Sequence, residues 1–338
     1  MSEELDALIR HTVVVDYGLP QPIHVSSILQ GRATNFLVRA DGRPWLCKVF
    51  QERYSVARIQ AAARYVDFLH AHGYPLQQFC RTVDGTVVSN LQGRAFVLIP
   101  YIEGAIIPTY TVASCDRLVV IGRLYGQIHR LSASYPQAAE LRESLPANWS
   151  LEPTLARFER LAPSPGAHAQ PELAQQLQMR LTVLRRIGPA LVASACQCNR
   201  GMIHGDYFAD HVVWAREGSW VIDVLGSYYY PGWELMRAFF QSIPPVSTLP
   251  DDAVAHLWSA FIAGYRDGRA IGSEELLRSF DLYLLQLLKS PYGLVPDTTV
   301  AQDAVKREQL LAFGRWRTMT GAALAERRPR LQEIIREG

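Results

Sequence analysis

The chain carries little net charge, has very few lysines, and contains no apolar run long enough to cross a bilayer. Its 338 residues have a formal charge of +2, so the basic surface typical of nucleic-acid binding is not indicated. A membrane-spanning helix needs roughly 20 apolar residues, and the acidic N-terminal sequence lacks the apolar segment of a secretory signal. We therefore expect a cytoplasmic protein without nucleic-acid or membrane partners; the sequence leaves its oligomeric state open.

Cysteine chemistry is also sparse. The five cysteines are scattered and odd in number, which is typical of free cytosolic thiols. Cys196 and Cys198 are too closely spaced for a zinc knuckle, and no second Cys/His pair lies near them in the sequence. No zinc site is indicated there.

Apolar periodicity predicts a strand-rich first part and a helical remainder. The first hundred residues read as a small antiparallel sheet with one helix packed on it. Strands are expected over 23–29, 36–39, 45–50, 79–83 and 93–99, and the helix over 55–71. Further along, we expect helices over 118–131, 173–195 and from 233 onward, with a strand over 220–224. The fold class is therefore α+β, and the length suffices for two lobes.

The segment from Met202 to Trp214 is the most unusual one, because it encloses two histidines and two aspartates between apolar residues. A carboxylate on a short loop between apolar anchors is held rigidly, as a residue that orients a substrate hydroxyl must be; Asp206 has that place. Asp223 follows on a strand and could hold Mg²⁺ with a neutral ligand from the loop. One such aspartate is often only a cap or a turn, but two joined by a hairpin favour a functional site.

A second candidate lies in the predicted sheet. Gly31 is at a bend between strands and Lys48 is on a following strand, an arrangement that can cover a polyphosphate. A glycine in a turn is weak support by itself. Lys48 is stronger, because its neighbours predict burial and a buried ammonium needs an anion. The alternative is a lysine at a sheet edge whose ammonium reaches solvent.

Together these residues resemble the aminoglycoside phosphotransferase and choline kinase family, which has a protein-kinase-like two-lobed fold. The resemblance runs over about residues 20–240 and depends mainly on the loop motif His204-Gly205-Asp206, four residues, His211, then Ile222-Asp223. Residues 98–104 correspond to the family's hinge, and residues 124–131 to a helix that ends in Leu-His-x-Leu. The resemblance implies a nucleotide-binding N-terminal lobe over 1–100 and a larger, mostly helical catalytic and substrate-binding lobe over 101–338, with a hinge at 99–104.

The resemblance also implies roles for single residues. Asp206 would accept the proton of the acceptor hydroxyl. Asp223 would bind Mg²⁺ that bridges the β- and γ-phosphates of ATP, and Lys48 would contact the α- and β-phosphates below the loop around Gly31. The adenine would be held by backbone groups of Pro100, Tyr101 and Ile102.

Three positions depart from the family pattern. His211 replaces the usual metal-binding Asn, as histidine also does in macrolide phosphotransferases; because a protonated ring cannot bind a metal, metal binding should depend on pH. Residues 53–66 contain no acidic residue, although the family places there a Glu that pairs with the lysine. Glu234 stands where an Asp usually anchors the catalytic loop.

These residues predict an ATP-dependent phosphotransferase that acts on a hydroxyl group of a small molecule. The acceptor could be an antibiotic, an amino alcohol or a sugar-like compound, and Asp210, Tyr230 and Trp233 are candidate contacts to it. The alternative is a nucleotide-binding regulatory protein with weakened catalysis, since two of the usual polar partners are replaced. Retention of both Asp206 and Asp223 favours the enzyme.

Overall fold

The computed structural model describes residues 3–21, 23–27, 33–52, 54–142, 150–163, 171–291, 294 and 304–338. The chain packs as two compact units. One comprises Met1–Ile107, Gln127–Glu143 and Gly201–Tyr229, and the other comprises Pro108–Gly126, Ser144–Arg200 and Tyr230–Gly338. The histidine- and aspartate-rich segment therefore packs in the same unit as the N-terminal sheet. The expected lobe boundary at 99–104 stays a prediction.

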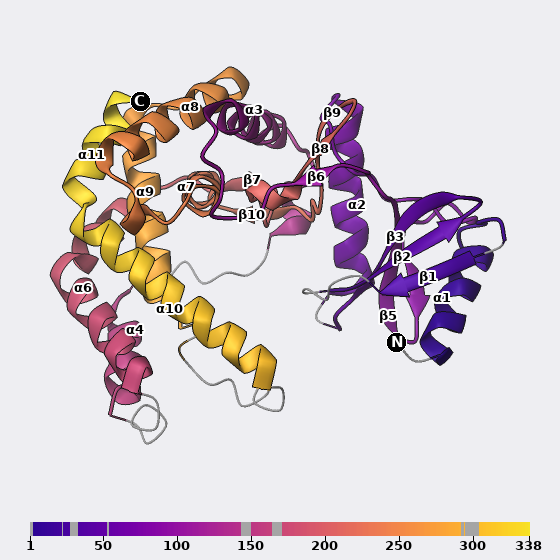
Figure 1. Cartoon of the computed structure of the whole chain (residues 1–338), viewed down its shortest axis with the longest axis horizontal. Coiled ribbons are helices and arrows are strands. Elements are labelled where there is room, and N and C mark those ends of the chain that lie inside the picture. Colours follow the sequence, from indigo (N-terminus) through magenta and orange to yellow (C-terminus); the bar gives the residue numbers. More distant parts are fainter. Residues whose placement is uncertain are drawn as a thin grey trace. The chain divides into compact units, whose positions relative to one another are not determined.

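The first unit contains a five-stranded antiparallel sheet with the strand order β1-β2-β3-β5-β4 (Figure 1). The strands are β1 (Ile23–Ser27), β2 (Ala33–Ala40), β3 (Arg43–Phe50), β4 (Ser89–Leu91) and β5 (Arg94–Pro100). The hairpin between β2 and β3 turns at Asp41 and Gly42, both with positive φ, as an Asp-Gly signal predicts. On the central strand β3, Lys48 is in register with Asn35 of β2 and Val97 of β5.

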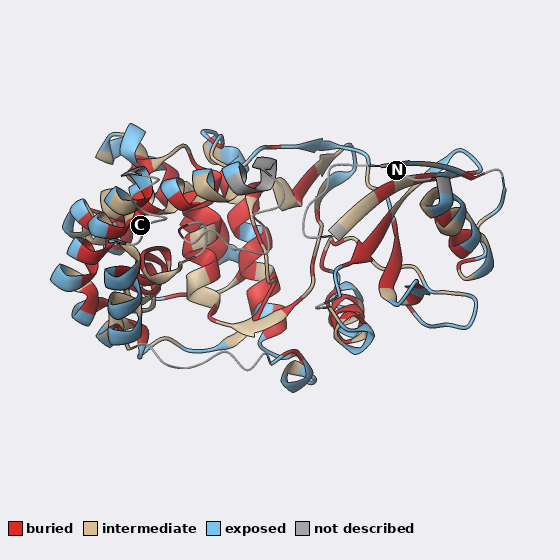
Figure 2. Cartoon of the chain, turned by 90° about the horizontal axis from the view of Figure 1, so that it is seen from below, coloured by how far each residue is buried: buried red, intermediate tan, exposed pale blue. Residues whose placement is uncertain are grey.

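Two helices, α1 (Glu3–Val15) and α2 (Val56–Ala71), pack on this sheet (Figure 1). Ile9 and Val13 of α1 belong to one apolar core cluster on one face of the sheet. Ile59 of α2 belongs to a second cluster, which contains the side chains on the other face. Figure 2 shows buried and intermediate stretches along the strands, and the second half of β3 is buried. Because side chains alternate along a strand, Lys48 shares the α2 side of the sheet with Phe50 and not the α1 side with Cys47.

Two expectations about this unit are wrong. The first is that only one helix packs on the sheet, because a second helix, α1, precedes the strands. Its residues Leu5, Leu8, Ile9 and Val13 recur at helical spacing and pack with the sheet. The second concerns residues 79–83, which form no strand. Their N–H groups bond to scattered acceptors, for example Cys80 N to Leu98 O at 2.8 Å, so no ladder forms, and the edge strand is β4 at 89–91.

Two smaller sheets complete the first unit. One contains β6 (Ala105–Ile106), β8 (Val212–Ala215) and β9 (Gly218–Val221), and the other pairs β7 (Gly201–Ile203) with β10 (Ser227–Tyr229). The strand expected over 220–224 therefore ends at Val221. Two backbone hydrogen bonds connect Val221 to the segment after α2. Its N–H donates to Pro75 O at 2.8 Å, and its carbonyl accepts from Gln77 N at 2.9 Å. These bonds fix the chain immediately before Asp223.

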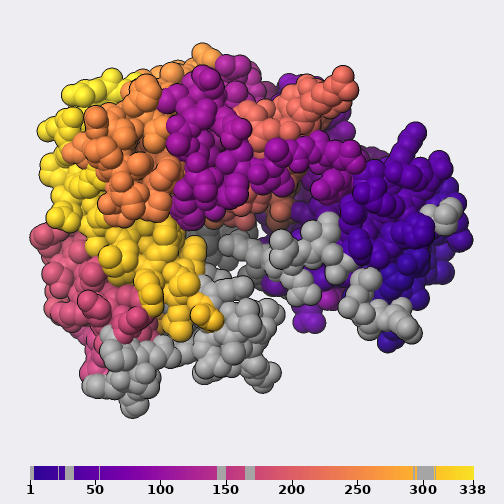
Figure 3. Space-filling model, viewed as in Figure 1, coloured from indigo at the N-terminus to yellow at the C-terminus, as the bar shows by residue number. Residues whose placement is uncertain are grey.

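The second unit is helical, as expected for the later part of the chain. Its helices are α4 (Glu152–Leu161), α6 (Pro171–Ala195), α7 (Pro231–Ser242), α8 (Asp251–Gly268), α9 (Ser273–Lys289), α10 (Ala304–Glu326) and α11 (Arg328–Glu337), and α3 (Cys115–Ser132) belongs to both units. Helix α9 contacts α6, α7, α10 and α11, and Figure 3 shows α10 and α11 in yellow. Among the described residues, no helix is long and apolar enough to span a membrane.

Candidate active site

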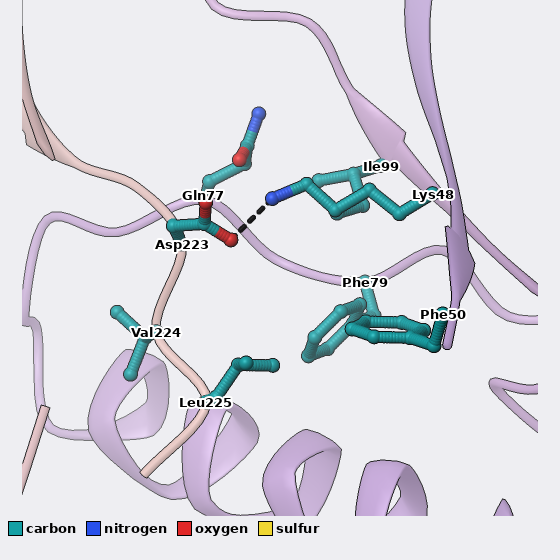
Figure 4. A pocket seen from close by; sticks show the side chains of 8 residues that line it. All are labelled: Lys48, Phe50, Gln77, Phe79, Ile99, Asp223, Val224 and Leu225. Atoms are coloured by element: carbon teal, nitrogen blue, oxygen red, sulfur yellow. Dashed lines mark hydrogen bonds and ion pairs between the residues drawn. The ribbon is translucent and has the colours of Figure 1, made fainter. Parts of the chain in front are cut away.

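Lys48 is buried, as its apolar neighbours predict, with 6% of its surface exposed. Its Nζ forms an ion pair and a hydrogen bond with Oδ1 of Asp223, 175 positions further along the chain. Figure 4 shows the two side chains pointing toward each other. Both line a small pocket whose other lining residues are Phe50, Gln77, Phe79, Ile99, Val224 and Leu225. The structure thus brings together two residues for which the sequence predicts phosphate and metal binding.

Asp223 lies two residues after the end of β9 and has a positive φ of 64°, a conformation that is uncommon for residues other than glycine. Its side chain is half-buried. Burial by itself raises the pKa of this carboxyl, but the charge of Lys48, the neighbouring His211 and the hydrogen bond from Lys48 lower the pKa to about 2. Asp223 is therefore ionised over the whole physiological range, which suits a metal ligand.

The lowered pKa of Asp223 predicts a pH-dependent contribution to stability. A carboxyl whose pKa falls from its ordinary value of about 3.9 to about 2 on folding stabilises the folded state above the higher value, and this contribution disappears as pH falls toward the lower one. We expect the difference in unfolding free energy between the wild type and Asp223→Asn to shrink as pH is lowered from about 5 to about 3. Urea unfolding at several pH values measures it. In a Lys48→Met background this pH dependence should be much weaker; an unchanged dependence would contradict the ion pair as its cause.

His204 holds the loop that contains Asp206. It is fully buried, its Nε2 lies 3.0 Å from the carbonyl of Ile222, and its Nδ1 accepts from the backbone N–H of Asp206 at 3.2 Å. A carbonyl can only accept, so Nε2 carries the proton and the ring is held in one neutral tautomer. The backbone carbonyl of His204 in turn accepts from Gly226 N at 2.9 Å. One side chain therefore joins the backbone of Asp206 to the residue before Asp223.

His211, at the end of the short 3₁₀ helix η2 (Ala209–His211), is oriented in a similar way. Its Nδ1 bonds to the carbonyl of Asp206, and since a carbonyl can only accept, Nδ1 is the donor; in the neutral ring, Nε2 is then the nitrogen that can bind a metal ion. The ring stacks on His204 with centroids 5.8 Å apart. The backbone carbonyl of His211 accepts from Ile222 N at 3.0 Å, so the loop and the residue before Asp223 are directly connected.

The donor set of this site fits a magnesium ion that is also bound by phosphates. No group of three or more His, Cys, Asp or Glu side chains converges as a metal site within the described part of the chain. Mg²⁺ at nucleotide sites takes one or two protein ligands and completes its shell with phosphate and water oxygens. The ionised carboxylate of Asp223 and the lone pair on His211 Nε2 would hold it. An imidazole suits softer metals better than Mg²⁺, so the carboxylate is the stronger of the two ligands.

The residues expected to hold adenine lie at the end of β5 and just after it. The carbonyl of Pro100 accepts a hydrogen bond from Gln77 Nε2 at 2.8 Å, and the N–H of Tyr101 bonds to Pro44 O at 3.2 Å. Tyr101 is 42% exposed, and Ile102 is half-buried. The backbone here is thus held by its neighbours, and its contact with a base stays a prediction.

The other predicted site residues are not all tested by the structure. Gly31 lies outside the described residues. Asp210 lies in η2 beside His211. Tyr230, Trp233 and Glu234 belong to the second unit, and Glu234 is fully buried in the first turn of α7. Their roles as substrate contacts, and that of Glu234 as an anchor, stay predictions.

The site also contains residues without a role predicted from the sequence. Gln77 lines the pocket and contacts Pro100 O, His204 joins the loop to the residue before Asp223, and Arg58 of α2 contacts the backbone just after it. The sequence signal for His204 was its place in the loop motif. For Gln77 and Arg58 the partners are backbone carbonyls, which leave no trace in a pattern of residue types.

Comparison with known proteins decides the family. Residues 24–271 match the phosphotransferase enzyme family (APH), and this range includes Lys48, Asp206, His211 and Asp223. The chain belongs to this family. Its membership confirms the resemblance seen in the sequence and the expectation of a small-molecule kinase that phosphorylates an alcohol group.

Individual phosphotransferases are similar to the chain at low identity. The homoserine kinase of Zymomonas mobilis is 21% identical over 258 residues, covering 75% of this chain and 74% of that enzyme. Homoserine kinases of other bacteria match over 56% to 77% of their own length. Spectinomycin phosphotransferase in complex with ADP and spectinomycin has a TM-score of 0.67 at 14% identity, covering 95% of this chain and 98% of that one. A microcompartment-associated aminopropanol kinase has a TM-score of 0.62 at 16% identity, covering 97% and 99%. These structures confirm the α+β, protein-kinase-like fold.

Proposed function

We propose that this phosphotransferase transfers the γ-phosphate of Mg²⁺-bound ATP to a hydroxyl group of a small molecule. The observation that carries the proposal is the ion pair between Lys48 and Asp223 in the same compact unit as Asp206 and His211. A buried lysine paired with an ionised aspartate can exchange that partner for a phosphate, while the aspartate exchanges the lysine for a metal ion. Each charge then remains compensated on nucleotide binding.

The chain's own residues supply positioning and proton transfer. Asp206 would accept the proton of the acceptor hydroxyl as that oxygen forms its bond to the γ-phosphorus and the bond between this phosphorus and the ADP oxygen breaks. Lys48 would contact phosphate oxygens, and Asp223 with His211 would hold the metal. When bound, Mg²⁺ compensates the negative charge of the β- and γ-phosphates. The loop backbone is fixed by His204, so Asp206 needs little reorganisation.

For the acceptor, we propose a small amino acid or amino alcohol that carries a hydroxyl group. This proposal is supported by the homoserine kinases among the sequence relatives and by the aminopropanol kinase among the structural ones. Other enzymes of similar fold act on antibiotics, including spectinomycin, so antibiotics are the alternative acceptors against which this proposal is tested.

A panel of acceptors measured by coupled ADP release tests this function. Homoserine, serine, an aminopropanol, choline, spectinomycin and a macrolide should be compared at equal concentration with Mg²⁺ and ATP. We expect ADP release above the acceptor-free rate with at least one hydroxyl amino acid or amino alcohol, and an acceptor-dependent rate about 10²- to 10⁴-fold lower with Asp206→Asn. Release with the antibiotics alone would overturn the acceptor class. Nucleotide binding without any acceptor-dependent turnover would instead favour the regulatory protein with weakened catalysis.

A further inference from the structure

Helix α2 offers Lys48 no carboxylate, yet it contacts the metal-binding segment by another route. Residues 53–66 contain neither Asp nor Glu, and Asp67 of the same helix pairs with Arg81 instead. Lys48 takes Asp223 as its partner. Arg58 of α2 donates to the backbone carbonyls of residues 225 and 226, which follow shortly after Asp223.

Arg58 binds two consecutive carbonyls with the two ends of its guanidinium group. Its Nη1 donates to the carbonyl of Leu225 at 3.0 Å, and its Nη2 donates to the carbonyl of Gly226. A guanidinium is planar and presents its donors in a fixed fork, so two such bonds define both the position and the direction of the backbone they hold. Hydrogen bonds from a charged donor are stronger than neutral ones. Arg58 therefore restrains the segment that starts at Asp223.

Gly226 is held from two further directions. Its N–H donates to the carbonyl of His204 at 2.9 Å. It has a φ of +61°, and a Cβ at this position would lie 2.6 Å from Cδ1 of Tyr65, also on α2. Only glycine fits that approach without strain. The catalytic loop and α2 thus converge on one peptide, three residues after the metal-binding aspartate.

Helix α2 is itself firmly attached within the first unit. Tyr65 is fully buried, its hydroxyl group bonds to Ser132 Oγ, and its ring packs edge-on against Tyr135 with centroids 5.1 Å apart. Arg64 pairs with Glu140 on the exposed surface of the helix, and a solvent-exposed ion pair adds little to this attachment. Because α2 is anchored in this way, the bonds of Arg58 to the carbonyls of residues 225 and 226 restrain that backbone.

We propose that Arg58 is a positioning residue that holds residues 223–226 in the conformation in which Asp223 faces Lys48 and the metal ion. The family pattern has a carboxylate on this helix that pairs with the lysine. In this chain the helix instead provides the guanidinium of Arg58, which binds backbone carbonyls. The effect on catalysis rests on the proposed function, whereas the effect on the backbone does not.

Arg58→Met tests the proposal, because methionine keeps the apolar stem and removes every donor. Arg58→Lys keeps the charge but loses the fork, and Arg64→Met is the matched control, since it removes an arginine of the same helix from a surface ion pair. All variants are measured as full chains. Hydrogen exchange of the Gly226 amide reports on the segment, and an amide of β5 reports on global stability. The Mg²⁺ concentration that gives half-maximal ATP turnover reports on the metal site.

In Arg58→Met we expect the Gly226 amide to exchange about tenfold faster, the equivalent of one lost hydrogen bond, while β5 exchanges as in the wild type. We expect half-maximal turnover to need on the order of tenfold more Mg²⁺, with Arg58→Lys between Arg58→Met and the wild type. If Arg58→Met behaves as Arg64→Met in both measurements, or if Gly226 and β5 accelerate equally, the proposal is wrong. A wild type without turnover would refute the proposed function, and the exchange comparison would still decide the role of Arg58.

Discussion

Asp206→Asn should lower kcat by about 10²- to 10⁴-fold, the range that a positioned general base contributes. The substitution removes the proposed proton acceptor and little else. The backbone N–H of Asp206 is bound by His204 Nδ1, and its carbonyl is bound by the His211 ring, so the loop is held through atoms that asparagine also has. Steady-state kinetics with the preferred acceptor measures the loss.

The same variant should bind Mg²⁺–ATP as the wild type does, because Asp206 is not one of the two proposed metal ligands. Isothermal titration with a non-hydrolysable ATP analogue gives that affinity. Asp267→Asn is the control: this carboxylate is 64% exposed and pairs with Arg123 on the surface of the second unit, so its removal should leave both quantities unchanged. An Asp206→Asn enzyme with wild-type kcat would show that another group accepts the proton.

Asp223→Ala should have the second largest effect, a loss of about 10²- to 10³-fold in kcat/KM, or roughly 3 to 4 kcal/mol of transition-state stabilisation. This carboxylate is the stronger of the two proposed metal ligands and also the partner of Lys48. Its removal leaves a buried ammonium without its anion and the metal without its carboxylate. Activity should become insensitive to Mg²⁺ over the range that saturates the wild type. Kinetics at several Mg²⁺ concentrations measures both effects.

Lys48→Met distinguishes the two roles of Asp223. This variant loses the phosphate contact of the ammonium but keeps the carboxylate, so the KM for ATP should rise while activity still responds to Mg²⁺. Equal loss of the Mg²⁺ response in Lys48→Met and Asp223→Ala would contradict the assignment of the metal to Asp223.

The chemistry-bearing residues were predictable from the sequence because each stands in a context that contradicts its polarity. Lys48 lies among apolar residues on a strand and is buried, and its partner Asp223 comes two residues after the end of the strand β9. The loop from His204 to His211 is enclosed by apolar anchors, and both histidines bond to its backbone or to the strand beside it. Burying such groups is costly unless they meet partners, so their presence predicts a site.

What the sequence could not supply depends on contacts between distant backbone atoms. The guanidinium of Arg58 meets carbonyls 167 and 168 positions away, and a carbonyl is the same for every residue type. Residues 79–83 are apolar enough for a strand, yet their N–H groups find acceptors on separate segments, which only the packed fold brings near. The N-terminal helix α1 could have been predicted from the helical spacing of its apolar residues.

A crystal structure of the protein with Mg²⁺ and a non-hydrolysable ATP analogue tests the central claim most directly. We predict the metal ion on the carboxylate of Asp223 and on Nε2 of His211, the ammonium of Lys48 on phosphate oxygens instead of on Asp223, and the carboxylate of Asp206 facing the γ-phosphate. A nucleotide bound with its phosphates away from Lys48, or a metal ion that Asp223 does not touch, would contradict the account.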